Sequence, residues 1–146
     1  MVESARQIPL EVWQNPQGDV ILKVSERECH VYFGCWDEES NPADYIAKLT
    51  FQNCSAAKYT HDEHLPYKIV GQRYHSCILI VEHSRWLNER MARKQKFYSN
   101  SLPSHDYKHF VVHGHEVIVE VIAKDFTLER ISKEQAGEFA RLIDEG

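Results

Sequence analysis

The chain lacks long hydrophobic runs and contains few glycines. No apolar stretch approaches the roughly 18 residues that a membrane-spanning helix requires. Only 6 of the 146 residues are glycine, and no phosphate-binding glycine loop, dinucleotide fingerprint or Gly-x-Ser-x-Gly motif occurs. Residues 1–7 lead into mixed sequence rather than the apolar stretch of a signal peptide. We therefore expect a soluble, cytoplasmic protein that makes no membrane contact.

An excess of positive charge is also missing. The 17 Lys and Arg residues are outnumbered by 22 Asp and Glu residues, which gives a formal net charge of -5. Sequence-independent binding to nucleic acid or to anionic membrane depends on Lys and Arg, so the overall charge argues against both, although a local basic patch stays possible. Hydrophobic residues make up 42% of the chain, as in ordinary globular proteins. We treat residues 1–146 as a single domain.

Paired cysteine motifs are absent. The four cysteines, Cys29, Cys35, Cys54 and Cys77, include no Cys-x-x-Cys pair, which excludes a zinc knuckle and a thioredoxin-like redox pair. We expect free, mostly buried thiols. Cys77 could be a nucleophile beside His75, but it lies in an apolar run, and an inert core thiol is the preferred interpretation.

The chain does contain a series of β-strand patterns. In residues 107–131, two runs rich in β-branched residues flank Gly114, which predicts an antiparallel hairpin. Further strands are predicted at residues 20–24, 29–33, 45–52, 55–60 and 75–81, with a weaker candidate at 10–13. Residues 75–81 are apolar on both faces, so we expect that strand to be central.

Two helices complete the predicted fold. Ser84 can cap a helix that runs to about Lys96. Ser132 and Gln135 have the spacing of a capping box, before an apolar stripe formed by Ala136, Phe139, Leu142 and Ile143. We predict an α+β fold that is mainly antiparallel β, a sandwich or partly open barrel of about six to eight strands with two short helices.

Histidine is abundant, with nine residues. Residues 61–73 contain Pro66 and Gly71 and are predicted to form a long loop. Within it, His61 and His64, together with Asp62 and Glu63, could supply nitrogen and oxygen ligands to a divalent metal. His113 and His115 beside Gly114 could complete the site if the hairpin tip lies near that loop. One hypothesis is therefore a metal-binding protein or metal-dependent hydrolase. The preferred interpretation is that these are solvated loop histidines and that the protein needs no cofactor.

Glu120 interrupts an apolar strand. A hairpin loop of residues 113–116 would place His109 opposite Glu120, whereas a three-residue loop would place Lys108 there. Either would form a cross-strand charge pair. The functional alternative is a carboxylate held in a cleft with a perturbed pKa, where it would act as a base.

Two charge clusters are candidate contact surfaces. The segment 37–44 is acidic, and the predicted helix 84–96 is basic and is followed by Phe97 and Tyr98. The candidate interaction residues are Asp37, Glu38, Glu39, Asp44, Arg90, Arg93 and Lys94. Each cluster could attract a partner protein by charge complementarity. Alternatively, the acidic segment could neutralise the helix within the molecule. A third possibility is that the helix binds nucleic acid.

Three short segments carry a resemblance to a known group of proteins. They are residues 80–87, Ile-Val-Glu-His-Ser-Arg-Trp-Leu, residues 107–110, Tyr-Lys-His-Phe, and residues 119–123, Val-Glu-Val-Ile-Ala. Over about residues 74–131 the chain resembles small uncharacterised bacterial β-rich proteins, some of them grouped with contact-dependent toxin immunity proteins. The resemblance implies a non-enzymatic protein that binds another protein. We therefore expect a non-catalytic protein-binding module, in one form an immunity-type neutralising protein.

Overall fold

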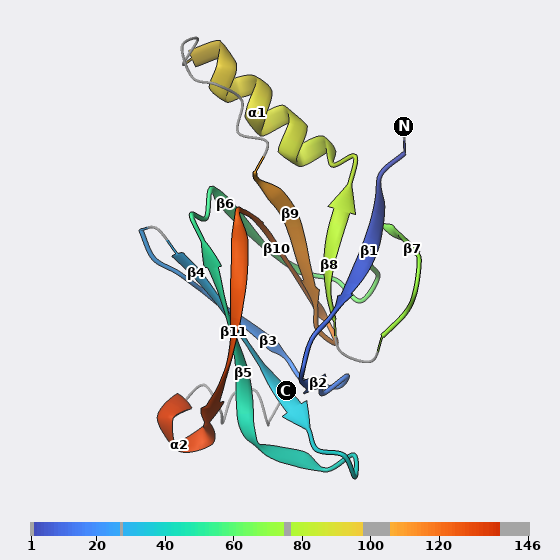
Figure 1. The fold of residues 1–146 in the computed structure, drawn as a ribbon, viewed down its shortest axis with the longest axis vertical. Helices are drawn as coiled ribbons and strands as arrows, with labels where there is room; N and C mark the ends of the chain where they lie inside the picture. The colour runs from blue at the N-terminus through green and yellow to red at the C-terminus, as the bar shows by residue number, and fades with distance from the viewer. Residues whose placement is uncertain (1, 27, 75–76, 98–105, 138–146) are drawn as a thin grey trace.

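The computed structural model describes residues 2–26, 28–74, 77–97 and 106–137, and the structural statements below concern these residues. They form two β-sheets that pack face to face (Figure 1). One sheet has six strands in the order β6-β10-β9-β8-β1-β7, and the other joins β11-β5-β4-β2 with β3 also paired to β4. The strands are β1 (Ser4–Pro9), β2 (Trp13–Gln14), β3 (Val20–Val24), β4 (Glu28–Trp36), β5 (Pro42–Gln52), β6 (Ala56–His61), β7 (Lys68–Val70), β8 (Cys77–Glu82), β9 (Lys108–His113), β10 (Val117–Ala123) and β11 (Asp125–Ser132).

The predicted fold class is confirmed, because the described residues form a mainly antiparallel β-structure with two helices. Strand β8 lies inside the six-stranded sheet as expected. The eleven strands of the described residues exceed the predicted number because β1, β7 and β11 had not been recognised. Strand β1 has few β-branched residues and is held by antiparallel pairing with β8 and parallel pairing with β7.

Strand β11 follows β10 directly, yet it belongs to the other sheet. The chain passes between the sheets at Lys124, whose backbone N–H donates to the carbonyl of Gln52 at 3.2 Å. From there β11 pairs along the whole of β5. Residues 117–132 therefore contain two strands, β10 and β11, that pair with strands of different sheets.

The predicted hairpin around Gly114 is formed by β9 and β10, but both predicted registers are wrong. Their last pair is His113 with Ile118, which places Val111 opposite Glu120. His109 lies opposite Ile122, two positions further along. Side chains two positions apart on a strand share a face, so His109 and Glu120 become diagonal neighbours, a separation that long side chains can bridge.

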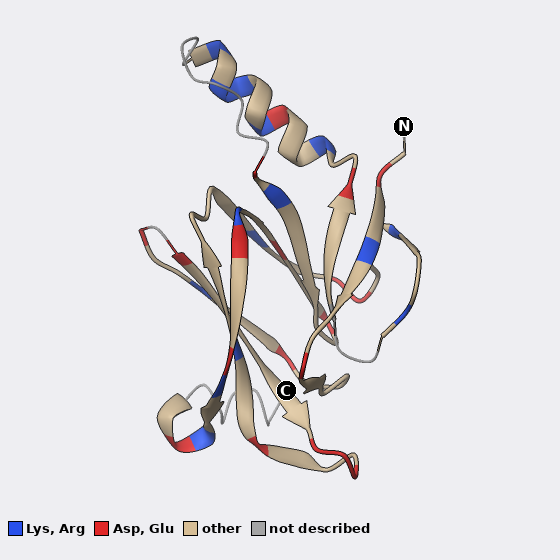
Figure 2. Ribbon diagram, in the orientation of Figure 1, with Lys and Arg blue, Asp and Glu red and all other residues tan. Residues whose placement is uncertain are grey.

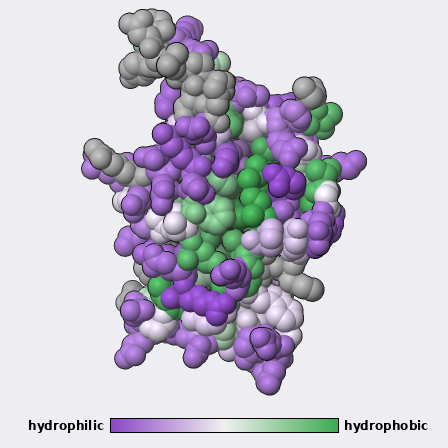
Figure 3. Space-filling view, in the orientation of Figure 1, coloured by the Kyte–Doolittle hydropathy of each residue, from purple (hydrophilic) through white to green (hydrophobic). Residues whose placement is uncertain are grey.

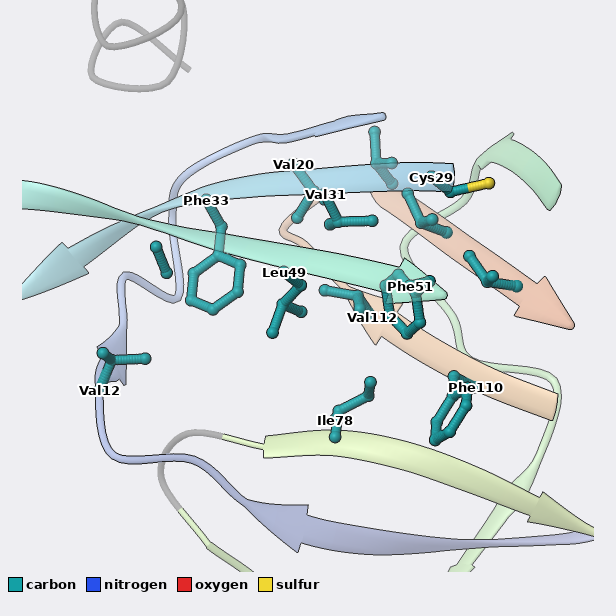
Figure 4. Close-up of a cluster of buried hydrophobic side chains, with 14 of the residues drawn as sticks. Val12, Val20, Cys29, Val31, Phe33, Leu49, Phe51, Ile78, Phe110 and Val112 are labelled. Carbon is teal, nitrogen blue, oxygen red and sulfur yellow. The ribbon is translucent and has the colours of Figure 1, made fainter. Parts of the chain in front are cut away.

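The main core fills the space between the sheets (Figure 4). Phe33, Leu49 and Phe51 from one sheet contact Ile78 and Phe110 from the other within this cluster. The opposite face of the six-stranded sheet has a second cluster, in which Ala5, Leu79, Val81, Val111 and Ile118 are covered by Leu65, Tyr67 and Ile69. All seven residues of β10 are buried because both of its faces are covered.

Helix α1 (Arg85–Phe97) extends beyond the sheets at one end of the long axis of the molecule (Figure 1). Ser84 caps it as predicted, since the Leu87 N–H donates to Ser84 Oγ at 3.0 Å. The predicted capping box is also confirmed at helix α2 (Lys133–Ala136), through Ser132 and Gln135. The rest of the predicted stripe, Phe139, Leu142 and Ile143, lies outside the described residues. None of the helices seen in the described ranges is long and apolar enough to cross a membrane.

Candidate functional site

A chain of buried hydrogen bonds lies on the outer face of the six-stranded sheet, where α1 begins. Ser84 Oγ lies 2.7 Å from His109 Nδ1, and His109 Nε2 lies 2.9 Å from Glu120 Oε1. The Tyr67 hydroxyl donates to the same oxygen of Glu120. Ser84 is 4% exposed, His109 0% and Glu120 7%. We call these four residues the buried relay.

One assignment of donors satisfies both bonds of His109, with a proton on Nε2 and none on Nδ1. Ser84 then donates to Nδ1, and the Nε2–H donates to the Glu120 carboxylate. Burial by itself raises the pKa of Glu120. Hydrogen bonds from His109 and Tyr67, and the electrostatic effects of His109 and then Lys58, outweigh burial and hold that pKa below its ordinary value. Burial, and then the hydrogen bond to Glu120, raises the pKa of Tyr67 well above its ordinary range.

The order serine, histidine, carboxylate is also that of acyl-transfer enzymes, but the surroundings of Ser84 differ from those of a nucleophile. Its hydroxyl accepts the capping bond from Leu87, and the serine is almost completely covered. The rings of Trp86 and Tyr67 lie edge-on to His109, at 5.1 and 5.6 Å between centroids. The arrangement ties the start of α1 to β9, β10 and the segment that carries Tyr67.

The sequence analysis identified Glu120 and the Ser84 cap separately and missed their connection. Glu120 is hydrogen-bonded to His109, as one alternative required, but through a diagonal rather than a directly opposite position. Tyr67 lies in residues 61–73, which the sequence predicts as a long loop, and nothing in their pattern indicates a buried partner for this tyrosine. The available signal was the presence of polar residues at apolar strand positions.

A second site is a groove of about 590 Å³ at the edge of the five-stranded sheet. Trp13 of β2 pairs with Trp36 of β4, and their ring centroids are 6.2 Å apart in an edge-to-face arrangement. We call this hollow the aromatic groove. Its lining consists of Pro9, Leu10, Glu11, Val12, Trp13, Trp36, Asp37, Glu38, Tyr45, Tyr74 and Arg130.

Charged groups surround these aromatic rings. Asp37 and Glu38 of the predicted acidic segment line the groove, whereas Glu39 and Asp44 are exposed outside its lining. The segment is folded by Asp37, whose Oδ1 accepts from the backbone N–H groups of Glu39 and Asn41 at 2.9 and 3.0 Å. Two of the four predicted acidic contact residues, Asp37 and Glu38, therefore line an aromatic groove that the sequence analysis did not predict.

The predicted metal ligands are brought near one another but are not gathered into one site. The Asp62 N–H donates to the Glu116 carbonyl at 3.0 Å, which holds the loop beside the hairpin tip. His61 and His64 line a hollow there, with Asp62, Glu63 and Glu116. His113 Nε2 instead lies 3.2 Å from the Glu63 carbonyl, and His115 Nε2 lies 3.9 Å from a Glu116 carboxylate oxygen. Across the described ranges, no group of three or more His, Cys, Asp or Glu side chains could hold a metal ion.

The basic helix and the acidic segment lie at opposite ends of the long axis (Figure 2). The interpretation that one neutralises the other within the molecule is therefore wrong. Arg90 is held by the body of the protein, donating to the carbonyl and hydroxyl oxygens of Ser55 at 3.0 and 3.2 Å. Arg93 and Lys94 are exposed and line a hollow with Phe97. Figure 3 shows hydrophobic surface midway along this face, with hydrophilic residues around it.

The expectation of free thiols is wrong for two of the four cysteines. Cys29 and Cys54 form a disulfide across a sequence separation of 25 residues. Cys35 is a free, buried thiol, and burial raises its pKa to about 12, so it is inert at neutral pH. His75 and the side chain of Cys77 lie outside the described part of the chain.

Comparison of the chain with protein-family models, with curated proteins and with solved structures finds no match.

Proposed function

We propose that this chain is a non-catalytic protein-binding module and that it binds its partner through the aromatic groove. The observation that carries the proposal is the presence of Trp13, Trp36, Tyr45 and Tyr74 around one concave hollow with carboxylates beside them. Ligand sites are typically concave and mostly apolar with a few polar groups. Trp and Tyr are also the residues that most often dominate binding energy at protein interfaces.

The buried relay supports a non-catalytic function because its serine is covered and caps a helix. The alternative of a metal-dependent protein lacks support, because the candidate histidines form no group of three or more metal ligands among the described residues. Nucleic-acid binding by α1 stays an alternative, since Arg93, Lys94 and Lys96 are exposed. The net charge of -5 favours a protein partner over it.

A neutralising activity of the immunity type, which the sequence resemblance implies, is one form of this proposal. The sequence alone predicts a cytoplasmic location for such a protein. The Cys29–Cys54 disulfide weighs against that location, because reducing compartments rarely maintain such bonds. The partner would then be met in an oxidising compartment.

Peptide display tests the proposed binding site. Short random peptides are selected on the wild-type protein and on Trp36→Ala, with Phe97→Ala as a matched control because Phe97 is an exposed aromatic outside the groove. Melting curves establish that each variant is folded. We expect enriched peptides that bind wild type and Phe97→Ala but not Trp36→Ala. An absence of enrichment, or equal enrichment on Trp36→Ala, contradicts the proposal.

A further inference from the structure

We infer that the aromatic groove recognises a cation, namely a Lys or Arg side chain in a basic segment of the partner protein. This inference rests on the proposed function and adds the chemical class of the bound residue. It is drawn from the aromatic rings, from the carboxylates beside them that form no ion pair among the described residues, and from the way the groove already holds one guanidinium.

The rings provide the first step. Trp13 and Trp36 meet at an interplanar angle of 64°. In such a pair the edge of one indole approaches the face of the other, and both indoles line the hollow. An indole face is the best aromatic acceptor for a cation, through the negative potential above its π-system. Leu10 and Val12 line the same hollow and can accommodate the aliphatic stem of a Lys or Arg side chain.

The carboxylates provide the second step. Glu11, Asp37 and Glu38 line the groove, against one cationic residue, Arg130. In the described residues, none of these three carboxylates lies within the 4.0 Å ion-pair distance of a Lys, Arg or His nitrogen. The groove therefore has an excess of negative charge, and residues 37–44 extend it with further acids and no Lys or Arg. Such a field attracts a basic segment and speeds its association.

Arg130 shows that the chemistry of the groove suits a guanidinium. Its Cζ lies 4.7 Å from the centroid of the Tyr45 ring, and its Nη2 donates to the carbonyl of Glu11 at 2.6 Å. This arginine is thus held by an aromatic face and a backbone carbonyl rather than by a carboxylate. Asp37 Oδ1 accepts two backbone N–H groups, whereas its second carboxylate oxygen and the Glu38 carboxylate accept no hydrogen bond among the described residues. These oxygens stay available to a second cation brought by the partner.

The occupant is a protein segment rather than a free small cation. A volume of about 590 Å³ greatly exceeds that of one guanidinium or ammonium group, and pockets of this size hold ligands of several hundred daltons. The charged residues lie beside aromatic and aliphatic ones along the lining. This arrangement suits a basic side chain flanked by its neighbours in an extended peptide.

Fluorescence titration tests the inference. Trp86 lies on α1, so Trp86→Phe leaves Trp13 and Trp36 of the groove as the only tryptophans. This protein is titrated with four pools of random short peptides free of Trp and Tyr, whose fixed central residue is Arg, Lys, Gln or Glu. Free arginine and spermidine are titrated as small cations. The Glu11→Gln/Glu38→Gln double variant removes two groove charges, and Glu89→Gln removes one charge on α1 as the matched control.

We expect the Arg and Lys pools to bind at least about 5-fold more tightly than the Gln pool, with affinity that falls as salt is added. The Glu11→Gln/Glu38→Gln variant should lose about that factor, Glu89→Gln should not, and Trp36→Ala should lose roughly 10-fold or more. Equal binding of the Gln and Arg pools that is lost in Trp36→Ala would overturn the cation inference and leave the proposed function standing. Free arginine or spermidine binding as tightly as the Arg pool would overturn the peptide occupant. No binding by any pool would contradict both proposals.

Discussion

The Ser84 hydroxyl lies 2.7 Å from Nδ1 of His109, although the two residues are 25 positions apart in the sequence. Ser84 ends the turn after β8, and His109 belongs to β9. The hydrogen bond therefore fixes the first turn of α1 to the sheet, at a point where both partners are removed from water. Helix α1 contains no buried residue of its own, so its attachment depends on this contact and on the bonds from Arg90 to Ser55.

Ser84→Ala should lower the free energy of unfolding by about 2–3 kcal/mol. About 1 kcal/mol is the usual cost of a lost helix cap, and the remainder comes from leaving His109 Nδ1 buried without a partner. Urea unfolding measures the change. Ser132→Ala is the matched control, because it removes an exposed cap from α2 without exposing a buried partner. Equal costs for the two variants would mean that the bond to His109 contributes nothing.

A serine-directed fluorophosphonate probe should not label the wild-type protein. Ser84 Oγ accepts the Leu87 N–H and lies in a covered position, so a reagent cannot approach it along a productive path. Intact-mass spectrometry after incubation measures the labelling, with Ser84→Ala as the control. Labelling of wild type that disappears in Ser84→Ala would show a reactive nucleophile and would contradict a non-catalytic function.

Stability should fall at acid pH through Glu120. The folded-state pKa of Glu120 lies below the ordinary value of 4.5, so its contribution is present above that value and is lost as pH falls through the folded pKa. Glu120→Gln should flatten the acid part of the stability curve. Urea unfolding between about pH 6 and pH 3 checks this, and Glu116→Gln is the exposed control. A Glu120→Gln curve parallel to that of wild type would contradict the lowered pKa.

Loss of the Cys29–Cys54 disulfide should destabilise the protein by about 3 kcal/mol. The bond closes a loop with a sequence separation of 25 residues, and cross-linking restricts the unfolded chain by about that amount. Thermal unfolding with and without reductant tests the effect, which should be absent in the Cys29→Ala/Cys54→Ala variant. Alkylation of the denatured, unreduced protein should spare Cys29 and Cys54. Their modification without reductant would show that the bond does not form.

Gly114→Ala should destabilise the fold by about 1–3 kcal/mol, the usual cost of overpacking. A Cβ at this position would lie 2.7 Å from Cγ2 of Val20, which is buried in the main core. Gly18→Ala is the control, since its nearest atoms would lie 3.5 Å away. A double variant with Val20→Ala should cost less than the sum of the single changes. Additive costs from urea unfolding would indicate that the two side chains do not clash.

Much of the β-structure could be predicted because it depends on patterns of neighbouring residues within each strand. The strands β3, β4, β5 and β8 and the hairpin of β9 and β10 have β-branched or alternating residues. Both helix caps were recognised for the same reason, since a cap involves residues only three positions apart. Strand β1 was missed because its formation depends on β8, more than 65 residues later, rather than on its own residues.

The candidate sites could not be predicted in the same way. The relay depends on how β9 is aligned with β10. A shift of this alignment by one residue would have turned His109 to the other face of the sheet. The groove depends on Arg130 of β11 lying beside Glu11 and Tyr45, which are far apart in the sequence. The disulfide joins cysteines whose spacing matches no motif, because the pairing of β4 with β5 brings them together.

The sequence by itself determined which segments are extended, where the helices begin, and how charge is divided between an acidic segment and a basic helix. These properties follow from local backbone preferences and from side-chain periodicity. Only the tertiary structure decided which buried polar groups meet, which cysteines pair, and which acidic residues stand beside tryptophans. These relationships depend on strand register and on the packing of one sheet against the other, and both are set by the whole chain.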